Sequence, residues 1–342
     1  MKTGEKMSEE IVVSICCLSY NHENYIVDAL EGFLTQKVNF KYEILIHDDA
    51  STDKTSEILM KYEQKYPDLI KVIYQKENQY SKGECVSKFL YEKSRGKYLA
   101  LCEGDDYWID KTKLQRQVDF LEKNSDYIAT YHNVLVVDKN KNKLKEYQDM
   151  HPLYKEHDIV KENLNQIYLC GQTASLVCKN FWKNWSEKEK NIFCSKKAPG
   201  DGKLSLVLLL MGKVHFFREI MSCYRVVLDG NSWTAKSKNK NQALLQYDIL
   251  MDLKRLADEM FKYDYNVDIN SFITYSFKIF LKKLTYSDMK IFFYLLNQRK
   301  SYFDVIYYTL KKISGVREER NESYPPLIQS VEKDLKGSYY EN

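Results

Sequence analysis

The sequence contains no apolar run long enough to cross a membrane. Its two longest runs, at 11–18 and 204–211, each include a Ser and fall far short of the ~20 residues that a membrane-spanning helix needs. An excess of one charge is also lacking, because 52 Lys and Arg against 48 Asp and Glu leave a net charge of only +4. So small an excess excludes a dedicated nucleic-acid binder. The first ten residues are charged and lack the apolar core of a signal peptide, so we expect a cytoplasmic protein.

The sequence also lacks the spacings of a zinc site. Its eight cysteines form no Cys-x-x-Cys pair, and its six histidines have no spacing that would join them to a cysteine. Four of the cysteines lie within apolar, strand-like runs, where cysteine packs as a small hydrophobic side chain. This use of cysteine supports the cytoplasmic placement.

Strand-like and helix-like patterns alternate over the first hundred residues. Continuous apolar runs predict strands buried on both faces, and apolar residues three or four apart predict the helices between them. The predicted strands are 11–18, 42–47, 71–74 and 98–102. The helices fall at 24–34 and after the capping residues Ser51, Thr52 and Asp53. This alternation predicts an α/β fold with an open, largely parallel sheet and helices on both faces.

Polar residues follow three of these predicted strands. Tyr20-Asn21 follows the first, Asp48-Asp49 the second and Glu103-Gly104-Asp105-Asp106 the fourth. Ligands of open α/β sheets bind beyond the carboxyl ends of the strands, so these residues are the candidate site. For Asp48-Asp49 two interpretations stay open: a turn whose acids cap the next helix, and a carboxylate that accepts a hydrogen bond from a base or ribose.

The turn from Glu103 to Trp108 concentrates three carboxylates at a strand end. Acids this close repel one another unless a cation lies between them. A hard divalent cation takes a few carboxylates and completes its coordination with diphosphate oxygens, and Gly104 permits the tight turn. The turn therefore predicts a metal and diphosphate site, and its alternative is an exposed acidic loop before a helix.

Asp201 lies between two glycines, just ahead of the apolar run 204–211. This position predicts a helix N-cap, and the same carboxylate is a candidate general base that a separate segment brings to the site. The stretch 171–175 precedes it and is interpreted equally as a strand-edge turn or as part of an acceptor pocket.

After the acidic turn the βα alternation ends. Leu114, Val118 and Leu121 predict a helix, 127–137 a long strand and 138–148 an exposed loop. Residues 243–313 have a helical pattern without proline. The predicted parts are therefore a flexible tail at 1–10, a catalytic domain at 11–235 and a helical region with a polar tail at 240–342.

Aromatic and basic residues interleave in the helical region, between about residues 289 and 312. Such helices pack on a catalytic domain, form a homodimer, or lie on an anionic membrane surface as a peripheral contact. We favour packing or dimerisation over the membrane contact.

Together these stretches resemble the family 2 glycosyltransferases of the GT-A fold. The matching segments are 13–21, 43–55, 96–108, Gly200-Asp201 and Tyr224-Arg225, so the resemblance covers about residues 10 to 232. It implies a GT-A (Rossmann-like) open mixed sheet flanked by helices, with a mostly α-helical C-terminal extension.

The resemblance also implies roles for individual residues. Asp201 would be the catalytic base, and Asp106 with Asp105 would hold Mn²⁺ or Mg²⁺ against the donor diphosphate. The residues implied to bind the nucleotide sugar are Leu18, Tyr20, Asn21, Asp49, Lys82, Glu103, Asp105 and Arg225. Those implied to shape the acceptor or donor-sugar pocket are Trp108, Gly171, Gln172 and Thr173. We favour a place near the donor sugar for Trp108, and the alternative is that it only anchors the loop. Glu103 stands where many members have Asp.

The implied reaction is the transfer of a hexose or N-acetylhexosamine from a nucleotide-diphosphate sugar, most often a UDP-sugar. The acceptor would be a hydroxyl of a glycan, a lipid-linked or a protein-linked molecule, in bacterial surface-glycan assembly. Because one base and no carboxylate nucleophile is evident, the expected reaction is a direct displacement with inversion at the anomeric carbon.

Three other functions are weighed against this one. A nucleotidyltransferase would carry a Gly-rich basic loop after the first strand, where this chain has 19–23. A phosphoacceptor signalling domain has its acid pair after the first strand, whereas here the pair follows the second. A degenerate protein that binds nucleotide sugars without turnover is disfavoured by the presence of Asp49, Asp105, Asp106 and Asp201.

Overall fold

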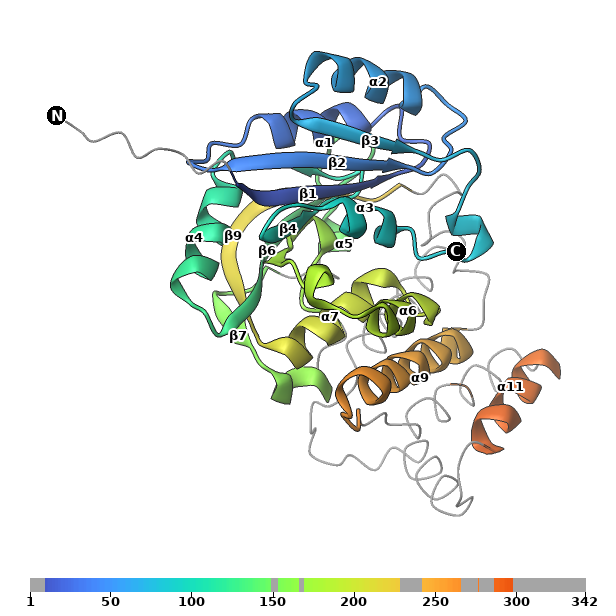
Figure 1. Cartoon of the computed structure of the whole chain (residues 1–342). Helices are drawn as coiled ribbons and strands as arrows, with labels where there is room; N and C mark the ends of the chain where they lie inside the picture. The colour runs from blue at the N-terminus through green and yellow to red at the C-terminus, as the bar shows by residue number, and fades with distance from the viewer. Residues whose placement is uncertain are drawn as a thin grey trace. The chain divides into compact units, whose positions relative to one another are not determined.

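A computed structural model describes residues 10–148, 153–165, 169–227, 242–265, 276 and 286–297 (Figure 1). Its strands are β1 (Ile11–Ser19), β2 (Lys41–Asp48), β3 (Ile70–Tyr74), β4 (Tyr98–Leu101), β5 (Tyr107–Trp108), β6 (Tyr127–Val137), β7 (His157–Ile159), β8 (Val177–Lys179) and β9 (Lys213–Arg225). Its α-helices are α1 (Ile26–Leu34), α2 (Thr55–Lys65), α3 (Ser87–Lys93), α4 (Lys113–Lys123), α5 (Lys145–Gln148), α6 (Glu187–Ser195), α7 (Gly200–Met211), α9 (Gln242–Phe261) and α11 (Tyr286–Asn297). Short 3-10 turns are η1 (Tyr80–Lys82), η2 (Lys161–Asn165), η3 (Thr173–Ser175) and η4 (Trp182–Asn184).

The strands form one mixed sheet in the order β3-β2-β1-β4-β8-β6-β9-β5, and β7 pairs with β9. The first four strands in this order are parallel, as the βα alternation predicts. β8 then runs antiparallel to both β4 and β6, whereas β6 and β9 are parallel. The predicted open mixed α/β sheet flanked by helices is confirmed, and so is its GT-A-like arrangement.

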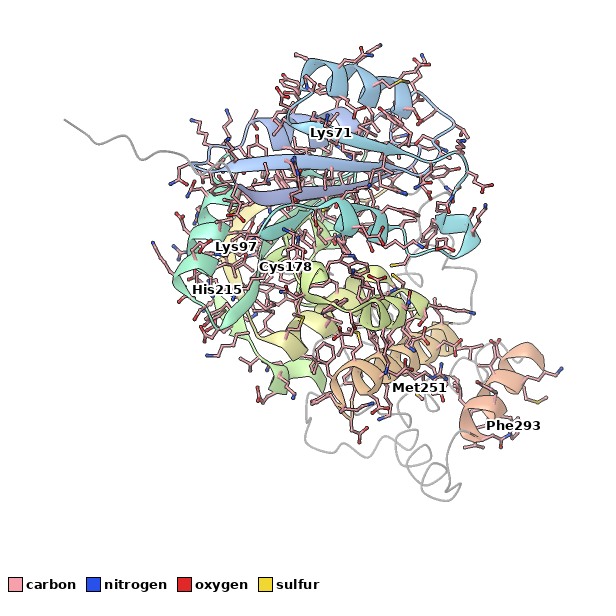
Figure 2. The ribbon with its side chains drawn as sticks, viewed as in Figure 1. Lys71, Lys97, Cys178, His215, Met251 and Phe293 are labelled. Atoms are coloured by element: carbon pink, nitrogen blue, oxygen red, sulfur yellow. The ribbon has the colours of Figure 1, made fainter. Side chains whose placement is uncertain are left out.

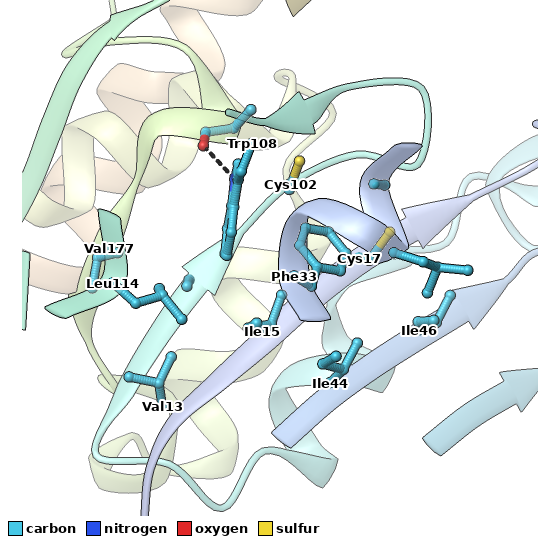
Figure 3. Close-up of a cluster of buried hydrophobic side chains, with 14 of the residues drawn as sticks. Val13, Ile15, Cys17, Phe33, Ile44, Ile46, Cys102, Trp108, Leu114 and Val177 are labelled. Carbon is cyan, nitrogen blue, oxygen red and sulfur yellow. Dashed lines mark hydrogen bonds between the residues drawn. The ribbon is translucent and has the colours of Figure 1, made fainter. Parts of the chain in front are cut away.

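One face of the parallel part packs against α1, α2 and α4. Figure 3 shows part of this layer, with Phe33 of α1 and Leu114 of α4. Val13, Ile15 and Cys17 alternate along β1 and point into this layer, because successive side chains of a strand face opposite sides. Phe33 of α1 meets the Trp108 ring edge-on, with ring centroids 4.8 Å apart. Apolar residues at helical spacing thus produce the buried faces that the pattern predicts.

The other face packs against α3 and the aromatic segment that leads into α6. Leu90 and Tyr91 of α3 are buried there, together with Phe181, Trp182 and Phe193. The rings contact one another, for example Tyr91 with Trp182 at a centroid separation of 5.4 Å. Helices therefore cover both faces of the sheet.

The chain divides into two units, which we describe separately. The sheet and its helices belong to the first unit, which extends to Val227 apart from residues 163–168. Those residues group with the C-terminal region, where α9 and α11 confirm the predicted helical character. In α11, Phe293 is 52% exposed (Figure 2).

Two predictions about the remaining segments can be compared with the structure. The segment 138–148, predicted as an exposed loop, ends in the short helix α5. The predicted N-terminal tail up to residue 9, all of 228–241 and the polar tail from 317 lie outside the described residues. Parts of the predicted helical stretch, at 266–275, 277–285 and 298–313, also lie outside them. No helix in the described part of the chain combines the length and the apolar character that a membrane span requires.

A buried carboxylate ties three elements of the parallel sheet together. Glu43 of β2 is 2% exposed and accepts hydrogen bonds from Ser14 Oγ (2.6 Å) and from the backbone N–H of Arg95 (2.7 Å). Ser14 Oγ in turn accepts from the N–H of Gly96 at 2.8 Å, immediately before β4. The backbone before β4 therefore lies directly against β1, and a Cβ at position 96 would come within 2.7 Å of the Val13 carbonyl carbon and 2.8 Å of the Tyr98 oxygen.

We predict that Gly96→Ala lowers the free energy of unfolding by about 1–3 kcal/mol or more, because the added methyl meets backbone atoms that cannot rotate away. Gly200→Ala is the matched control: the same change in the first turn of α7 meets no atom within 4 Å, and we expect a neutral or slightly stabilising effect. Urea unfolding of both variants measures the difference. Equal stability of the two variants would contradict the close approach at Gly96.

Candidate functional site

Three loops of the predicted site meet at the carboxyl edge of adjacent strands. The parallel register places Ser19, the last residue of β1, opposite Asp48, the last residue of β2. Backbone hydrogen bonds continue past both strand ends, from the N–H of Asp49 to the Ser19 carbonyl (3.0 Å) and from Gly104 to the Leu18 carbonyl (2.8 Å). The structure thus brings together the loops that the sequence analysis selected after the first, second and fourth predicted strands.

Asn21 joins the first loop to the second. Its backbone adopts a positive φ of 55°, which asparagine tolerates better than most residues. Its side-chain oxygen accepts a hydrogen bond from the N–H of Thr52 (2.8 Å), and its own N–H donates to Ser51 Oγ (3.0 Å). Tyr20 beside it is 41% exposed, so its ring is accessible at this edge.

Asp48 and Asp49 have different partners. The Asp48 carboxylate accepts hydrogen bonds from the hydroxyls of Ser51 and Ser56, and so fixes the turn into α2. The Asp49 carboxylate accepts from the N–H of Gln79 (2.7 Å) and of Tyr80 (3.0 Å), which orders the segment at η1. Asp48 therefore holds the turn but does not cap α2, whose N-cap is Lys54 and has no side-chain cap hydrogen bond. Binding of a base by Asp49 stays a prediction.

The acidic turn packs closely on the loop after β1. A Cβ at Gly104 would lie 2.8 Å from His22 Nδ1 and 2.9 Å from Ile26 Cδ1, so this position has room for glycine alone. His22 Nε2 lies 3.9 Å from the Asp105 carboxylate, whose side chain is 31% exposed. Asp106 points inward instead and is 2% exposed.

Arg225, the last residue of β9, clamps the acidic turn from behind. Its backbone N–H donates to Asp106 Oδ1 (2.7 Å), and its guanidinium donates to the Asp105 carbonyl (2.5 Å) and to Asp28 Oδ2 (2.7 Å). The guanidinium also lies over the rings of Tyr25 and Tyr107, at 4.7 and 5.0 Å. Because this side chain is 0% exposed, Arg225 positions the turn in this structure, and its predicted contact with the donor stays a prediction.

Two carboxylates of the turn, Glu103 and Asp106, have raised pKa values. Burial, with the negative charges of Asp105 and Asp201, raises the pKa of Glu103 to about 8. Burial and the charges of Asp105 and Glu103 raise the pKa of Asp106 well above its usual range, although Arg225 opposes the rise. Because the charge of Asp201 contributes to the raised pKa of Glu103, Asp201 lies close to the acidic turn.

Asp201 reaches the acidic turn from the first turn of α7. It is not the helix N-cap that we predicted, because Pro199 occupies that position and Asp201 is the second helical residue. Its Oδ1 accepts the N–H of Gly202 at 2.7 Å, as a carboxylate in a first helical turn can do. Burial raises the pKa of Asp201, which makes the carboxylate a stronger base than an exposed aspartate.

The remaining predicted pocket residues divide into two groups. Thr173 donates its side-chain hydrogen bond to Glu103, and Gly171 and Gln172 directly precede it. A Cβ at Gly171 would lie 2.5 Å from the Tyr131 ring. Trp108, in contrast, lies in the core: it is 4% exposed, and its indole N–H donates to the Ala174 carbonyl at 2.9 Å (Figure 3). Its position fits the loop-anchoring alternative.

Lys82 is the last residue of η1, in the segment that follows β3. Its ammonium group pairs with Glu77, and its side chain is 47% exposed. It therefore lies on the segment that Asp49 orders, and its contact with a donor stays a prediction.

A small cavity of about 30 Å³ lies between Leu18, Glu103, Thr173 and α3. It has room for about one water molecule, so a nucleotide sugar must bind outside it. Among the described residues, no group of three or more His, Cys, Asp and Glu side chains is arranged as a complete metal site. Binding of Mn²⁺ or Mg²⁺ by Asp105 and Asp106 therefore stays a prediction.

Three residues near the acidic turn were missed as site residues by the sequence analysis. His22 adjoins Asp105, and Asp28 pairs with Arg225. Burial raises the pKa of Tyr224, and the charges of Asp106, Asp105, Glu103 and Asp201 add to this rise, so Tyr224 also lies near the turn. His22 follows Tyr20-Asn21 directly, which is the signal that could have identified it. Asp28 lies inside a predicted helix, where nothing in the sequence marks its partner.

Comparisons with known proteins agree with this geometry. Residues 14–185, half of the chain, match the family model described as Glycosyl transferase family 2. An uncharacterized protein of Mycobacterium tuberculosis is 42% identical over 36% of this chain and 36% of its own length. The Escherichia coli enzyme WfaP, a UDP-Glc:alpha-D-GlcNAc-diphosphoundecaprenol beta-1,3-glucosyltransferase, is 32% identical over 36% of this chain and 47% of its own length. The chain therefore spans less than half the length of these relatives.

A solved structure resembles the fold over most of both chains. The crystal structure of S. aureus TarS 1-349 in complex with UDP-GlcNAc superposes with a TM-score of 0.58 at 16% identity. It covers 95% of this chain and 89% of the TarS chain. At this identity the likeness establishes the fold.

We predict that Arg225→Met lowers the free energy of unfolding by about 3–5 kcal/mol, because it removes the buried guanidinium that pairs with Asp28 and that opposes the negative charge of Asp106. Arg225→Lys should recover only part of the loss, since one ammonium cannot reach both Asp28 and the Asp105 carbonyl or stack between two rings. Lys141→Met removes the exposed second partner of Asp28, at 2.8 Å, and should cost less than ~1 kcal/mol. Chemical denaturation of the three variants tests this order, which a small effect of Arg225→Met would overturn.

Proposed function

This chain belongs to glycosyl transferase family 2, and we propose that it transfers a sugar from a nucleotide-diphosphate sugar, a UDP-sugar, to an acceptor hydroxyl with inversion. One observation carries the proposal: Asp49, the acidic turn and Asp201 converge at the carboxyl edge of a GT-A-like sheet. Adjacent residues on one edge of the sheet would then bind the donor, neutralise its diphosphate and remove the acceptor proton.

The nucleotide would bind along the loops after β1 and β2. Leu18 and the exposed ring of Tyr20 supply apolar surface for a base, and Asn21 holds the two loops together. Asp49 would accept a hydrogen bond from the base edge, with Lys82 nearby on the segment that Asp49 orders. The UDP-Glc donor of the E. coli relative supports uracil as the base.

The diphosphate would lie against the acidic turn. Asp105 is the carboxylate best placed to hold a divalent ion there, since its side chain is partly exposed, whereas Asp106 is bonded inward to Arg225. The chemistry that Mn²⁺ or Mg²⁺ supplies, when bound, is electrostatic stabilisation of the departing diphosphate. Glu103, held by Thr173, would keep the turn in position from the side of the pocket.

Asp201 would remove the proton from the acceptor hydroxyl as the hydroxyl oxygen attacks the anomeric carbon. The new glycosidic bond forms on the face opposite the departing diphosphate, so the configuration inverts. The raised pKa of Asp201 favours this role, because general-base efficiency grows as the pKa approaches the working pH. Gly171, Gln172 and Thr173 would line the path of the acceptor beside it.

The acceptor would be a glycan or a lipid-linked glycan of surface-polysaccharide assembly. Support comes from the E. coli relative, whose acceptor is a diphosphoundecaprenol-linked sugar. A peripheral contact with the inner face of the membrane and a homodimer through the C-terminal helices remain predictions. The alternative is a protein that binds nucleotide sugars without turnover, and the two experiments below separate it from an enzyme.

We predict that UDP binds the wild-type protein at least tenfold more tightly with Mn²⁺ than without it, which is about 1.4 kcal/mol. Asp105→Asn should abolish this metal-dependent gain, while Asp119→Asn, the same change on the exposed side of α4, should retain it. Isothermal titration calorimetry measures both. Binding of GDP, CDP or dTDP in place of UDP would change the donor class, and binding of no nucleotide would refute the proposal.

We predict that Asp201→Asn lowers kcat by about 10²–10⁴-fold with little change in UDP affinity, because the base acts only in the transfer step. In the wild type, kcat/KM should rise with pH through an apparent pKa above the ordinary ~3.9 of aspartate, since burial raises the pKa of Asp201 and only its ionised form accepts a proton. Asp126→Asn, an exposed control, should leave the pH profile unchanged. The rate of UDP release measures the turnover of a UDP-sugar. Unchanged kcat in Asp201→Asn would exclude it as the base, and binding without turnover would favour the alternative.

A further inference from the structure

Two of the eight cysteines differ from the other six in their surroundings. Cys85 and Cys194 are partly exposed, whereas the others are buried: Cys16, Cys17, Cys102, Cys170, Cys178 and Cys223. Burial raises the pKa of each buried thiol and keeps it protonated and inert. Cys178, labelled in Figure 2, is one of these core residues in β8.

The two partly exposed thiols contact each other although they lie far apart in the sequence. Cys85 lies in the loop between η1 and α3, and Cys194 lies in the last turn of α6. Their side chains are hydrogen-bonded to each other, and Cys85 Sγ also lies 3.6 Å from Ser87 Oγ. Both segments belong to the first unit, so the fold itself brings the two sulfur atoms together.

Cationic groups surround this thiol pair. Lys203 Nζ donates to the carbonyls of Phe193 (3.1 Å) and Lys196 (3.0 Å), which flank Cys194 in the sequence. Lys88, on the first turns of α3, lies within the field of both thiols while pairing with Glu84 at 2.6 Å. The hydrogen bond from Cys194, followed by the charge of Lys203, lowers the pKa of Cys85 below that of an ordinary thiol. Such surroundings are typical of reactive rather than structural cysteines.

We propose that Cys85 and Cys194 form a redox modification site that reacts with low-molecular-weight disulfides and closes a reversible bridge between the loop before α3 and helix α6. The Cys85 thiolate attacks one sulfur of a disulfide RSSR and expels RS⁻, which leaves a mixed disulfide on Cys85. Cys194 then loses its proton to solvent and attacks Cys85 Sγ, which expels the second RS⁻. In sum, two protein thiols are oxidised to a disulfide and RSSR is reduced to two RSH.

The bridge would restrain two segments that lead to the candidate site. The loop that holds Cys85 follows η1, whose Tyr80 N–H is bound by Asp49. Helix α6 leads through Pro199 into α7, which carries Asp201. The thiol chemistry itself does not depend on the proposed glycosyl transfer, so it can be tested without a sugar substrate.

The test treats the native full-length protein with oxidised glutathione and maps the products by peptide mass spectrometry. We expect a peptide pair joined through Cys85 and Cys194, the loss of two free thiols, and full reversal by dithiothreitol. The six buried cysteines serve as internal controls and should react only after denaturation. Glutathione adducts spread over several cysteines, an adduct on Cys85 without a bridge, or no reaction would each overturn the proposal.

Three variants separate the roles of the two thiols. Cys194→Ser keeps a hydroxyl donor but removes the resolving sulfur, so a stable glutathione adduct on Cys85 should accumulate. Cys85→Ser should lose the reaction, because the attacking thiolate is gone. Cys194→Ala removes the donor, so the pH midpoint of Cys85 alkylation by iodoacetamide should rise toward the ~8.5 of free cysteine, while Cys194→Ser stays below it. The same pH midpoint of Cys85 alkylation in both Cys194 variants would contradict the contact between Cys85 and Cys194. If a variant fails to fold, peptide mapping of the oxidised wild-type protein still decides the proposal.

Discussion

One buried guanidinium holds the acidic turn against its own repulsion. Burial raises the pKa of Glu103, Asp106 and Asp201, and the negative charge of Asp105 raises the pKa of Glu103 and Asp106 further. Arg225 opposes this with a backbone N–H on Asp106 and a guanidinium on the Asp105 carbonyl and Asp28. Because β5 pairs with the end of β9 that carries Arg225, the hydrogen-bond register of the sheet sets the distance between the turn and its cation.

Asp105 and Asp106 have different surroundings, because Arg225 contacts them through different atoms. The Arg225 N–H is bonded to the Asp106 carboxylate, which points inward and fixes the geometry, whereas Asp105 keeps an exposed carboxylate. Burial raises the pKa of Glu103, Asp106 and Asp201, so these groups tend to hold protons in the absence of a cation. A divalent cation that arrives with an anionic donor would favour their ionised forms and could bind the outward carboxylate.

Most strands of the sheet could be predicted, because apolar runs and the alternation of strands with helices are visible in short stretches of sequence. The convergence of the loops after these strands could be predicted from the same alternation. The parallel register alone places Ser19 beside Asp48, and this follows from two adjacent parallel strands. The partners of Arg225 and the burial of Trp108 could not be predicted, since they depend on the antiparallel pairing of β5 with β9 across about 120 residues of chain. Asp201 was misplaced as an N-cap because Pro199, two residues earlier, is the N-cap of α7.

The geometry of Asp49 also bears on which bases the proposed donor site would accept. Both of its oxygens already accept a backbone N–H, from Gln79 and from Tyr80, and each oxygen has a second lone pair that can accept another hydrogen. An ionised carboxylate only accepts, so a base must present an N–H at this edge. Uracil, thymine and guanine have a ring N–H to donate, whereas cytosine can donate only from its exocyclic amine, because its ring nitrogen at that edge is an acceptor. The same side chain that orders η1 would thus accept a ring N–H from uracil, thymine or guanine and an amine N–H from cytosine.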